Sequence, residues 1–135
     1  MSATDAAVTA LAGEQAAVYA YGVIAAQLSG AQEKQALAAM SAHRANRDLL
    51  LAQLQTAGAT PSPAAAAYTL PSPVVDAASA RALAGLVEDR LAGQWAALAA
   101  ASDGEQRSAA ALVAQACAVR GVTWTGIAPV WSGAV

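Results

Sequence analysis

The chain has 135 residues, the commonest size of a single domain and a length that one hydrophobic core can serve. Its formal net charge of −2, with only seven Lys and Arg, argues against nucleic acid as a partner, because such binding needs a basic stripe. Alanine dominates the composition, phenylalanine is absent and β-branched residues are sparse, so helices are favoured and strands have little to form from.

The first residues and the single cysteine bear on the location of the protein. Met1 leads into Thr4 and Asp5 rather than into the basic region and apolar core of a secretory signal. Cys117 has no second cysteine with which to form an internal disulfide. The most apolar segment, residues 16–28, is too short to span a membrane. We therefore expect a cytoplasmic protein without a membrane partner.

The first two predicted helices are joined by a tight turn. A helix is predicted over about residues 5–28, and Ser29-Gly30 marks its end. Ser29 and Gln32 have the spacing of a capping box, so a second helix is predicted over 30–57, where Gly58 can form a left-handed C-terminal cap. Such a short connection makes the two helices antiparallel.

Residues 58–75 are predicted to form a long crossover. The segment contains four prolines, which lack a backbone donor and bias the preceding residue toward extended geometry: Pro61, Pro63, Pro71 and Pro73. About 18 extended residues reach roughly 55 Å, whereas a helix of 26 residues is only about 39 Å long. The segment can therefore cross the whole bundle, which would make the second and third helices parallel. A plain up-down-up-down bundle with a looped-out linker is the alternative.

The last two predicted helices form a second hairpin. Asp76 is a suitable N-cap for a third helix, predicted over about residues 76–101. Asp103 and Gln106 again have capping-box spacing, which predicts a fourth helix over 104–125.

An apolar tail is predicted over residues 126–135, because Pro129 and the surrounding small residues do not favour a helix. Trp131 in this tail either packs on the bundle or contacts a protein partner. The four helices, the crossover and the tail together predict one domain over residues 1–135.

Spacings of three and four place polar side chains on the apolar stripes of all four helices. With the crossover, these residues lie at similar heights in the bundle. Because buried charges are tolerated only when they are paired, we predict a core polar network in one mid-bundle layer. Its predicted members are Glu14 from the first helix, His43, Arg44 and Arg47 from the second, Glu88 from the third and Arg120 from the fourth.

Four strings resemble an alanine-rich bacterial ferritin-like family of unassigned function, a domain of unknown function. They are Glu14-Gln15-Ala16-Ala17-Val18-Tyr19-Ala20-Tyr21-Gly22, His43-Arg44-Ala45-Asn46-Arg47-Asp48, Tyr68-Thr69-Leu70-Pro71 and Pro129-Val130-Trp131. Their order and spacing extend the resemblance over nearly the whole chain. It implies an all-α, ferritin-like four-helix bundle with one long crossover between helices 2 and 3, and it implies no activity.

The ligand set of a di-iron centre is incomplete. Di-iron ferritin-like proteins place one Glu on each of two helices and a Glu-x-x-His pair on each of the other two. Glu14 and Glu88 match the lone glutamates and His43 matches one histidine, but Met40 stands where the paired glutamate would be. Because the chain contains a single His, two Glu-x-x-His motifs are impossible. A di-iron oxidase or ferroxidase centre of that kind is excluded.

Three functions remain open. The leading hypothesis is a non-catalytic module without a cofactor that acts through association, as a homo-oligomer and most simply a dimer, with salt bridges in place of the metal centre. The second is a metalloprotein or oxidoreductase that holds one Fe or Mn ion at Glu14, His43 and Glu88, although nearby guanidinium groups would compete for the carboxylates. The third is a carrier that holds a small apolar ligand in the bundle.

Two further features receive structural interpretations. Cys117 lies on an apolar stripe, so we interpret it as a small buried hydrophobe rather than a redox thiol. Gly22, Gly85, Gly93 and Gly121 lie inside predicted helices, where glycine costs about 1 kcal/mol relative to alanine. Close approach of a neighbouring helix would explain them.

Overall fold

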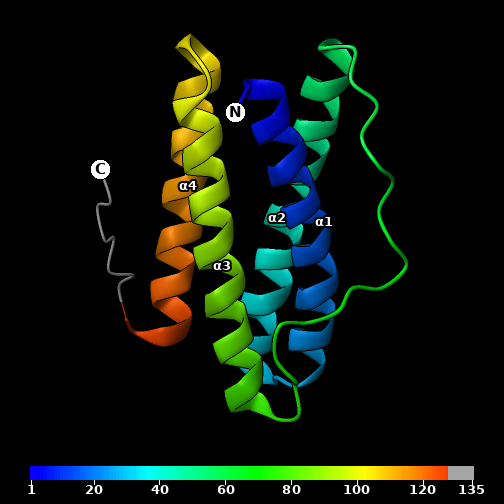
Figure 1. Ribbon diagram of the computed structural model, residues 1–135. Helices are drawn as coiled ribbons and strands as arrows, with labels where there is room; N and C mark the ends of the chain where they lie inside the picture. Colours follow the sequence, from blue (N-terminus) through cyan, green and yellow to red (C-terminus); the bar gives the residue numbers. More distant parts are fainter. Residues whose placement is uncertain (128–135) are drawn as a thin grey trace.

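Four helices account for most of the chain in the computed structural model, which describes residues 1–127 (Figure 1). The four predicted helices are confirmed, with their ends shifted by no more than two residues. The predictions about Pro129 and Trp131 lie outside the described residues. The observed helices are α1 (Ala3–Ala26), α2 (Gly30–Thr56), α3 (Ala77–Ala100) and α4 (Gly104–Thr125).

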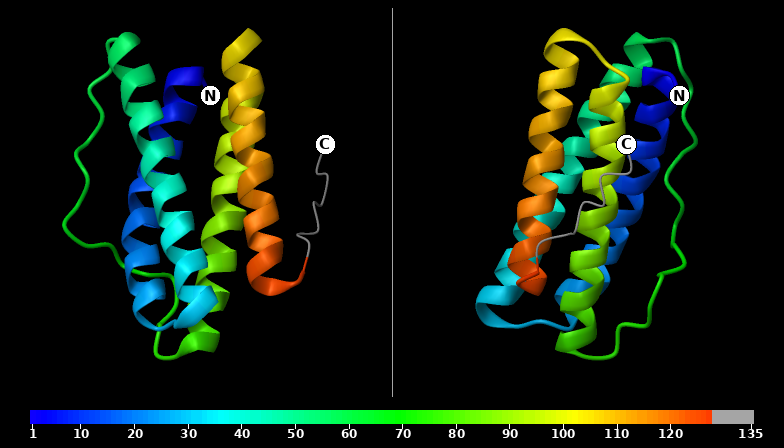
Figure 2. Two further views of the ribbon diagram at one scale, coloured as in Figure 1. Left: turned by 180° about the vertical axis from the view of Figure 1, so that it is seen from behind. Right: turned by 60° about the vertical axis from the view of Figure 1, so that its left-hand side comes forward.

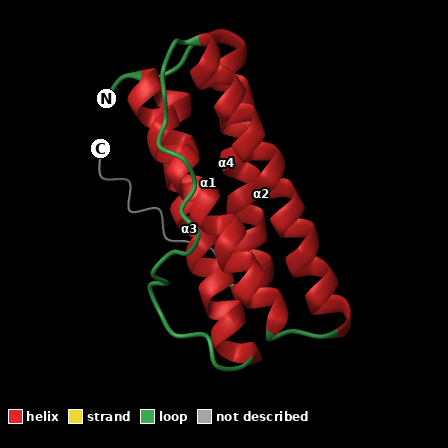
Figure 3. Ribbon diagram, turned by 90° about the vertical axis from the view of Figure 1, so that its right-hand side faces the viewer, coloured by secondary structure: helices red, strands yellow, loops and turns green. Residues whose placement is uncertain are grey.

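The long loop between α2 and α3, residues 57–76, runs back along the outside of the bundle from one end to the other (Figures 1 and 3). As a result α2 and α3 run in the same direction, while α1 and α4 run in the opposite one. The predicted crossover is confirmed, and the up-down-up-down alternative is wrong.

Two antiparallel hairpins, α1 with α2 and α3 with α4, stand side by side (Figure 2). They are joined mainly through α1, which packs against α3. Within residues 1–127, none of the helices has the length and the apolar character that crossing a membrane requires.

Capping boxes fix the starts of α1 and α3. The Ser2 hydroxyl accepts a hydrogen bond from the Asp5 backbone N–H, and the Asp5 carboxylate accepts one from the Ser2 backbone. This box starts α1 two residues before the predicted position. Asp76 and Ser79 form the same arrangement at the start of α3, which confirms Asp76 as its cap.

The capping boxes predicted for α2 and α4 are wrong. The side chains of Ser29 and Asp103 make no capping hydrogen bond. Gly30 and Gly104, the first residues of these helices, have φ values of 58° and 55°. Only glycine adopts this left-handed geometry at little cost, so both helices begin at a glycine bend that the capping-box spacing did not indicate.

The C-terminal end of α2 follows the prediction. Gly58 has a φ of 75°, and the Ala59 N–H donates to the carbonyl of Leu54. Together with the bond from the Gly58 N–H to the Gln55 carbonyl, this forms a Schellman motif.

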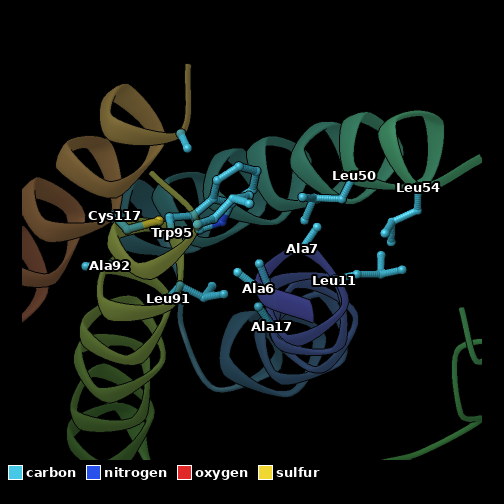
Figure 4. Close-up of a cluster of buried hydrophobic side chains, with 13 residues drawn as sticks. Ala6, Ala7, Leu11, Ala17, Leu50, Leu54, Leu91, Ala92, Trp95 and Cys117 are labelled. Carbon is cyan, nitrogen blue, oxygen red and sulfur yellow. The ribbon is translucent and has the colours of Figure 1, made fainter. Parts of the chain in front are cut away.

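The hydrophobic core consists of two clusters at different heights of the bundle. One is formed mainly by the first half of α1, the second halves of α2 and α3, and Ala110 and Cys117 of α4, and it contains Leu11, Leu50 and Trp95 (Figure 4). The other is formed by the opposite halves and contains Ile24 and Trp124. Many members of both clusters are alanines, so close approach of the helices supplies much of the packing.

Close approach explains two of the four glycines that the sequence analysis singled out. A Cβ atom on Gly85 would lie 2.3 Å from Cγ2 of Thr125, and one on Gly121 would lie 2.8 Å from Oδ1 of Asp89, so α3 and α4 pack closely at both positions. The same explanation is wrong for Gly22 and Gly93, where a Cβ atom would meet no atom of the described residues within 4 Å.

Candidate functional site

Buried polar residues meet in one layer between the two core clusters, with His43 of α2 at its centre. The Nδ1 atom of His43 lies 2.6 Å from Oε2 of Glu14 on α1, and its Nε2 atom lies 2.7 Å from Oε1 of Glu88 on α3. All three side chains are fully buried. The structure thus brings together the three polar residues that the apolar stripes of α1, α2 and α3 indicated.

The geometry favours a positively charged imidazole ring. Each ring nitrogen of His43 faces a carboxylate oxygen, and a neutral imidazole could donate to only one of them. Burial lowers the pKa of His43, but the hydrogen bonds to Glu14 and Glu88 outweigh that effect and raise the pKa to about 9. For Glu88, burial raises the carboxyl pKa, but the hydrogen bond and charge of His43, followed by the charge of Arg120, lower it overall.

Arg120 of α4 completes the charge balance. Its Nε atom donates to Oε1 of Glu88 at 3.0 Å, and its side chain is 25% exposed. Two carboxylates therefore face one imidazolium and one guanidinium. This pairing fits the general requirement that charges removed from water be compensated.

Two aromatic donors contact the carboxylates in a crossed arrangement. Tyr21 of α1 donates its hydroxyl to Glu88 of α3 at 2.6 Å, and Trp95 of α3 donates its indole N–H to Glu14 of α1 at 2.7 Å. Each donor follows the glutamate of its own helix by seven residues. Because α1 and α3 are antiparallel, this spacing brings each donor to the glutamate of the other helix.

Two further side chains extend the network. Trp124 donates its indole N–H to the Tyr21 hydroxyl at 3.0 Å, and Asn46 donates to Oε1 of Glu14 at 3.1 Å. The sequence analysis placed neither residue in the network, and it missed Tyr21 and Trp95 as well. The seven-residue spacing from each glutamate to an aromatic donor was a signal that could have identified Tyr21 and Trp95.

Two of the six predicted network residues lie outside it. Arg44 is exposed, and Arg47 is partly exposed with its Nε atom 3.0 Å from the surface carboxylate of Asp48. Including them was wrong, because His43 and Arg120 already balance both buried carboxylates. A further buried cation would lack a counter-ion.

The arrangement separates the three candidate metal ligands. Glu14 and Glu88 contact opposite nitrogens of His43, so the ring lies between the two carboxylates and the three groups do not converge on one point. Within residues 1–127, no group of three or more His, Cys, Asp or Glu side chains is arranged to hold a metal ion. Met40, at the position of the missing glutamate, packs against the second core cluster.

The remaining groups around the layer are unreactive in character. Cys117 is fully buried, and burial raises the pKa of its thiol above the usual range. Burial and the charge of Glu88 likewise raise the pKa of the Tyr21 hydroxyl. Oε1 of Glu88 accepts three hydrogen bonds, whereas its Oε2 atom is buried without a partner in the described structure. The layer thus holds two paired carboxylates and neither a reactive thiol nor a free imidazole.

The chain is similar to proteins that have no assigned activity. Residues 6–131 match the sequence profile of a family described as "Domain of unknown function (DUF4439)". A solved structure, a conserved hypothetical protein (rv2844) from Mycobacterium tuberculosis, superposes with a TM-score of 0.86 at 33% sequence identity. The similarity covers 90% of this chain and 94% of the other. No curated protein matches the sequence significantly.

Proposed function

We propose that this chain, which belongs to the DUF4439 family, is a non-catalytic helical module that acts by association, first of all with a second copy of itself. The observation that carries the proposal is the charge-balanced layer around His43. In di-iron proteins of ferritin-like fold, inward-facing carboxylates and histidines bind metal. Here Glu14, Glu88 and His43 bind one another, and Arg120 balances the remaining charge. These ionisable side chains therefore serve to hold the helices together.

The outer face of α4 offers the surface for association. Leu112 and Val119 are 66% and 64% exposed, and the exposed Ala116 and Thr123 continue the same stripe at spacings of three and four residues. From Ser108 to Val119 the helix carries no charged residue. Such spacing suits packing against another helix.

A second copy is a suitable partner for this stripe. A two-fold axis places the same surface of each subunit against the other, so an uncharged stripe meets an uncharged stripe without repulsion between like charges. From Leu112 to Thr123 the stripe is roughly 17 Å long at the usual rise of an α-helix. That is small for a stable dimer, so we expect an equilibrium between monomer and dimer at micromolar concentrations.

Sedimentation velocity over a range of protein concentrations tests the proposal. We expect dimers whose fraction rises with concentration and which disappear in the double variant Leu112→Glu, Val119→Glu. Val75→Glu is the matched control, because Val75 is 73% exposed on the long loop, away from α4. A protein that stays monomeric at high concentration, or dimers that survive the double variant, would contradict the proposal.

A further inference from the structure

A cleft of about 520 Å³ lies between α1, α3 and the long loop. Small residues of α1 form its floor, including Ala12, Gly13 and Ala16. Val87 and Leu91 of α3 form one wall. The cleft is therefore wide because the α1 side chains are short, and its surface is mostly apolar.

The long loop forms the opposite wall and is held in place by its own contacts. The ring of Tyr68 packs against that of Tyr19 on α1, with centroids 5.8 Å apart. Leu70 packs against the second core cluster. Both Tyr68 and Leu70 line the cleft. These two contacts hold the loop in place, so ligand binding would order little additional chain. The loop therefore favours a preformed binding site.

The polar groups of the cleft are suited to an anion. Arg90 is the one charged residue that lines it, and within residues 1–127 Arg90 takes part in no salt bridge or side-chain hydrogen bond. Asp89, its neighbour in the sequence, lies toward Gly121 of α4 and so does not neutralise it. A cation without a partner at the rim of an apolar cleft complements a ligand with one negative charge.

Gln94 adds an amide with unused hydrogen-bonding capacity. It lies one turn beyond Arg90 on α3 and lines the same cleft. Its Oε1 atom is buried and has no hydrogen-bond partner within residues 1–127. Because Oε1 only accepts hydrogen bonds, the Nε2 group at the other end of the amide is the one that can donate to a carboxylate. The Oε1 atom lies against Gly13, where an added Cβ would be 2.0 Å away, so the glycine makes room for the amide. A few placed polar groups in an apolar pocket commonly fix the orientation of a ligand.

We propose that this cleft binds an amphipathic monocarboxylate, with its apolar body against the α1 floor and its carboxylate at Arg90 and the Nε2 donor of Gln94. The cleft extends along α1 from Val8 to Ala20, roughly 18 Å at the usual helical rise, which suits an extended acyl chain. The site lies outside the polar layer and the α4 stripe, so it does not depend on the proposed dimer.

Calorimetric titration with decanoate, below the concentration at which it forms micelles, tests the proposal. Decyltrimethylammonium serves as a probe with the same chain and the opposite charge. We expect decanoate to bind with one-to-one stoichiometry and at least about tenfold more tightly than the cation, the difference that one charge-assisted contact supplies. Decanoate should also shift the side-chain amide signals of Gln94 in NMR spectra.

Four variants distinguish this site from non-specific binding. Arg90→Gln should weaken decanoate binding about tenfold and leave the cation unaffected, whereas Arg44→Gln, which removes an exposed arginine of α2, should change neither. Ala16→Leu should abolish binding of both probes by filling the cleft, and Ala12→Leu, also in the floor of the cleft, provides a second filling variant if the first unfolds. Equal affinity for the two probes, or binding unchanged by Arg90→Gln and by cleft filling, would overturn the proposal. Absence of decanoate binding together with dimers that break on Ala16→Leu would also overturn it, and would show that a second copy fills the cleft.

Discussion

Replacing Arg120 of α4 by leucine removes the cation that balances the charge of Glu88. The guanidinium Nε atom lies 3.0 Å from Oε1 of a fully buried carboxylate, while the Arg120 side chain is 25% exposed. Loss of one partner from a buried ion pair costs about 3–5 kcal/mol, and the partial exposure of Arg120 places this pair at the lower end. We expect Arg120→Leu to lower the free energy of unfolding by about 3 kcal/mol, and the melting temperature by roughly 10 °C in a chain of this size.

Urea unfolding followed by tryptophan fluorescence and circular dichroism measures this loss. Arg44→Leu is the matched control, because Arg44 is exposed and should change stability by less than about 0.5 kcal/mol. Adding Glu88→Gln to Arg120→Leu restores the charge balance, since Glu14 then faces His43 alone. The double variant should therefore lose about 1–3 kcal/mol less than the sum of the two single variants. An unchanged stability in Arg120→Leu, or strict additivity in the cycle, would refute the charge-balance reasoning.

Three more predictions follow from the same contacts. Because the pKa of His43 is raised from 6.5 to about 9, its stabilising contribution is complete below pH 6.5 and is lost as the pH rises through about 9. Urea titrations should show the free energy of unfolding falling by about 3 kcal/mol over that interval, and far less in His43→Gln. Tyr21→Phe removes the donor to Glu88 and should cost about 2 kcal/mol in the same assay; a neutral effect would contradict the bond. Gly85→Ala should destabilise by about 1–3 kcal/mol through its clash with α4, whereas Gly93→Ala should stabilise by up to about 1 kcal/mol in thermal melts, and equal effects would refute the packing argument.

The topology of the bundle could be predicted because it depends on the lengths of the helices and of the segments that connect them. A segment with four prolines between two long helices can span the bundle, and two short turns force antiparallel pairs. The capping contacts at the helix starts were harder to predict, because the spacing that begins at Ser29 and Asp103 does not reveal whether the following glycine turns left-handed. Glycine adopts positive and negative φ about equally readily, so the residue type alone does not decide between them.

The polar layer was predicted in part, and for an identifiable reason. Helical periodicity places Glu14, His43 and Glu88 on inward stripes, but it fixes the direction of a long side chain only within a wide arc. Arg47 and Arg120 both lie near such stripes, and only the contacts show that Arg120 turns inward while Arg47 pairs with Asp48. The hydrogen bonds donated by Tyr21 and Trp95 depend on the relative height of two antiparallel helices, which the sequence indicates only to within about a turn.

The protonation state of His43 tests the central claim most directly. His43 is the single histidine of the chain, so its ring signals in a long-range nitrogen–proton NMR spectrum need no assignment. The charge-balanced layer predicts that both ring nitrogens carry protons at neutral pH and that the ring titrates with a pKa of about 9. A ring that is neutral at neutral pH and titrates near the ordinary value of 6.5 would contradict the account, because one ring nitrogen would then face a buried carboxylate oxygen with no proton between them.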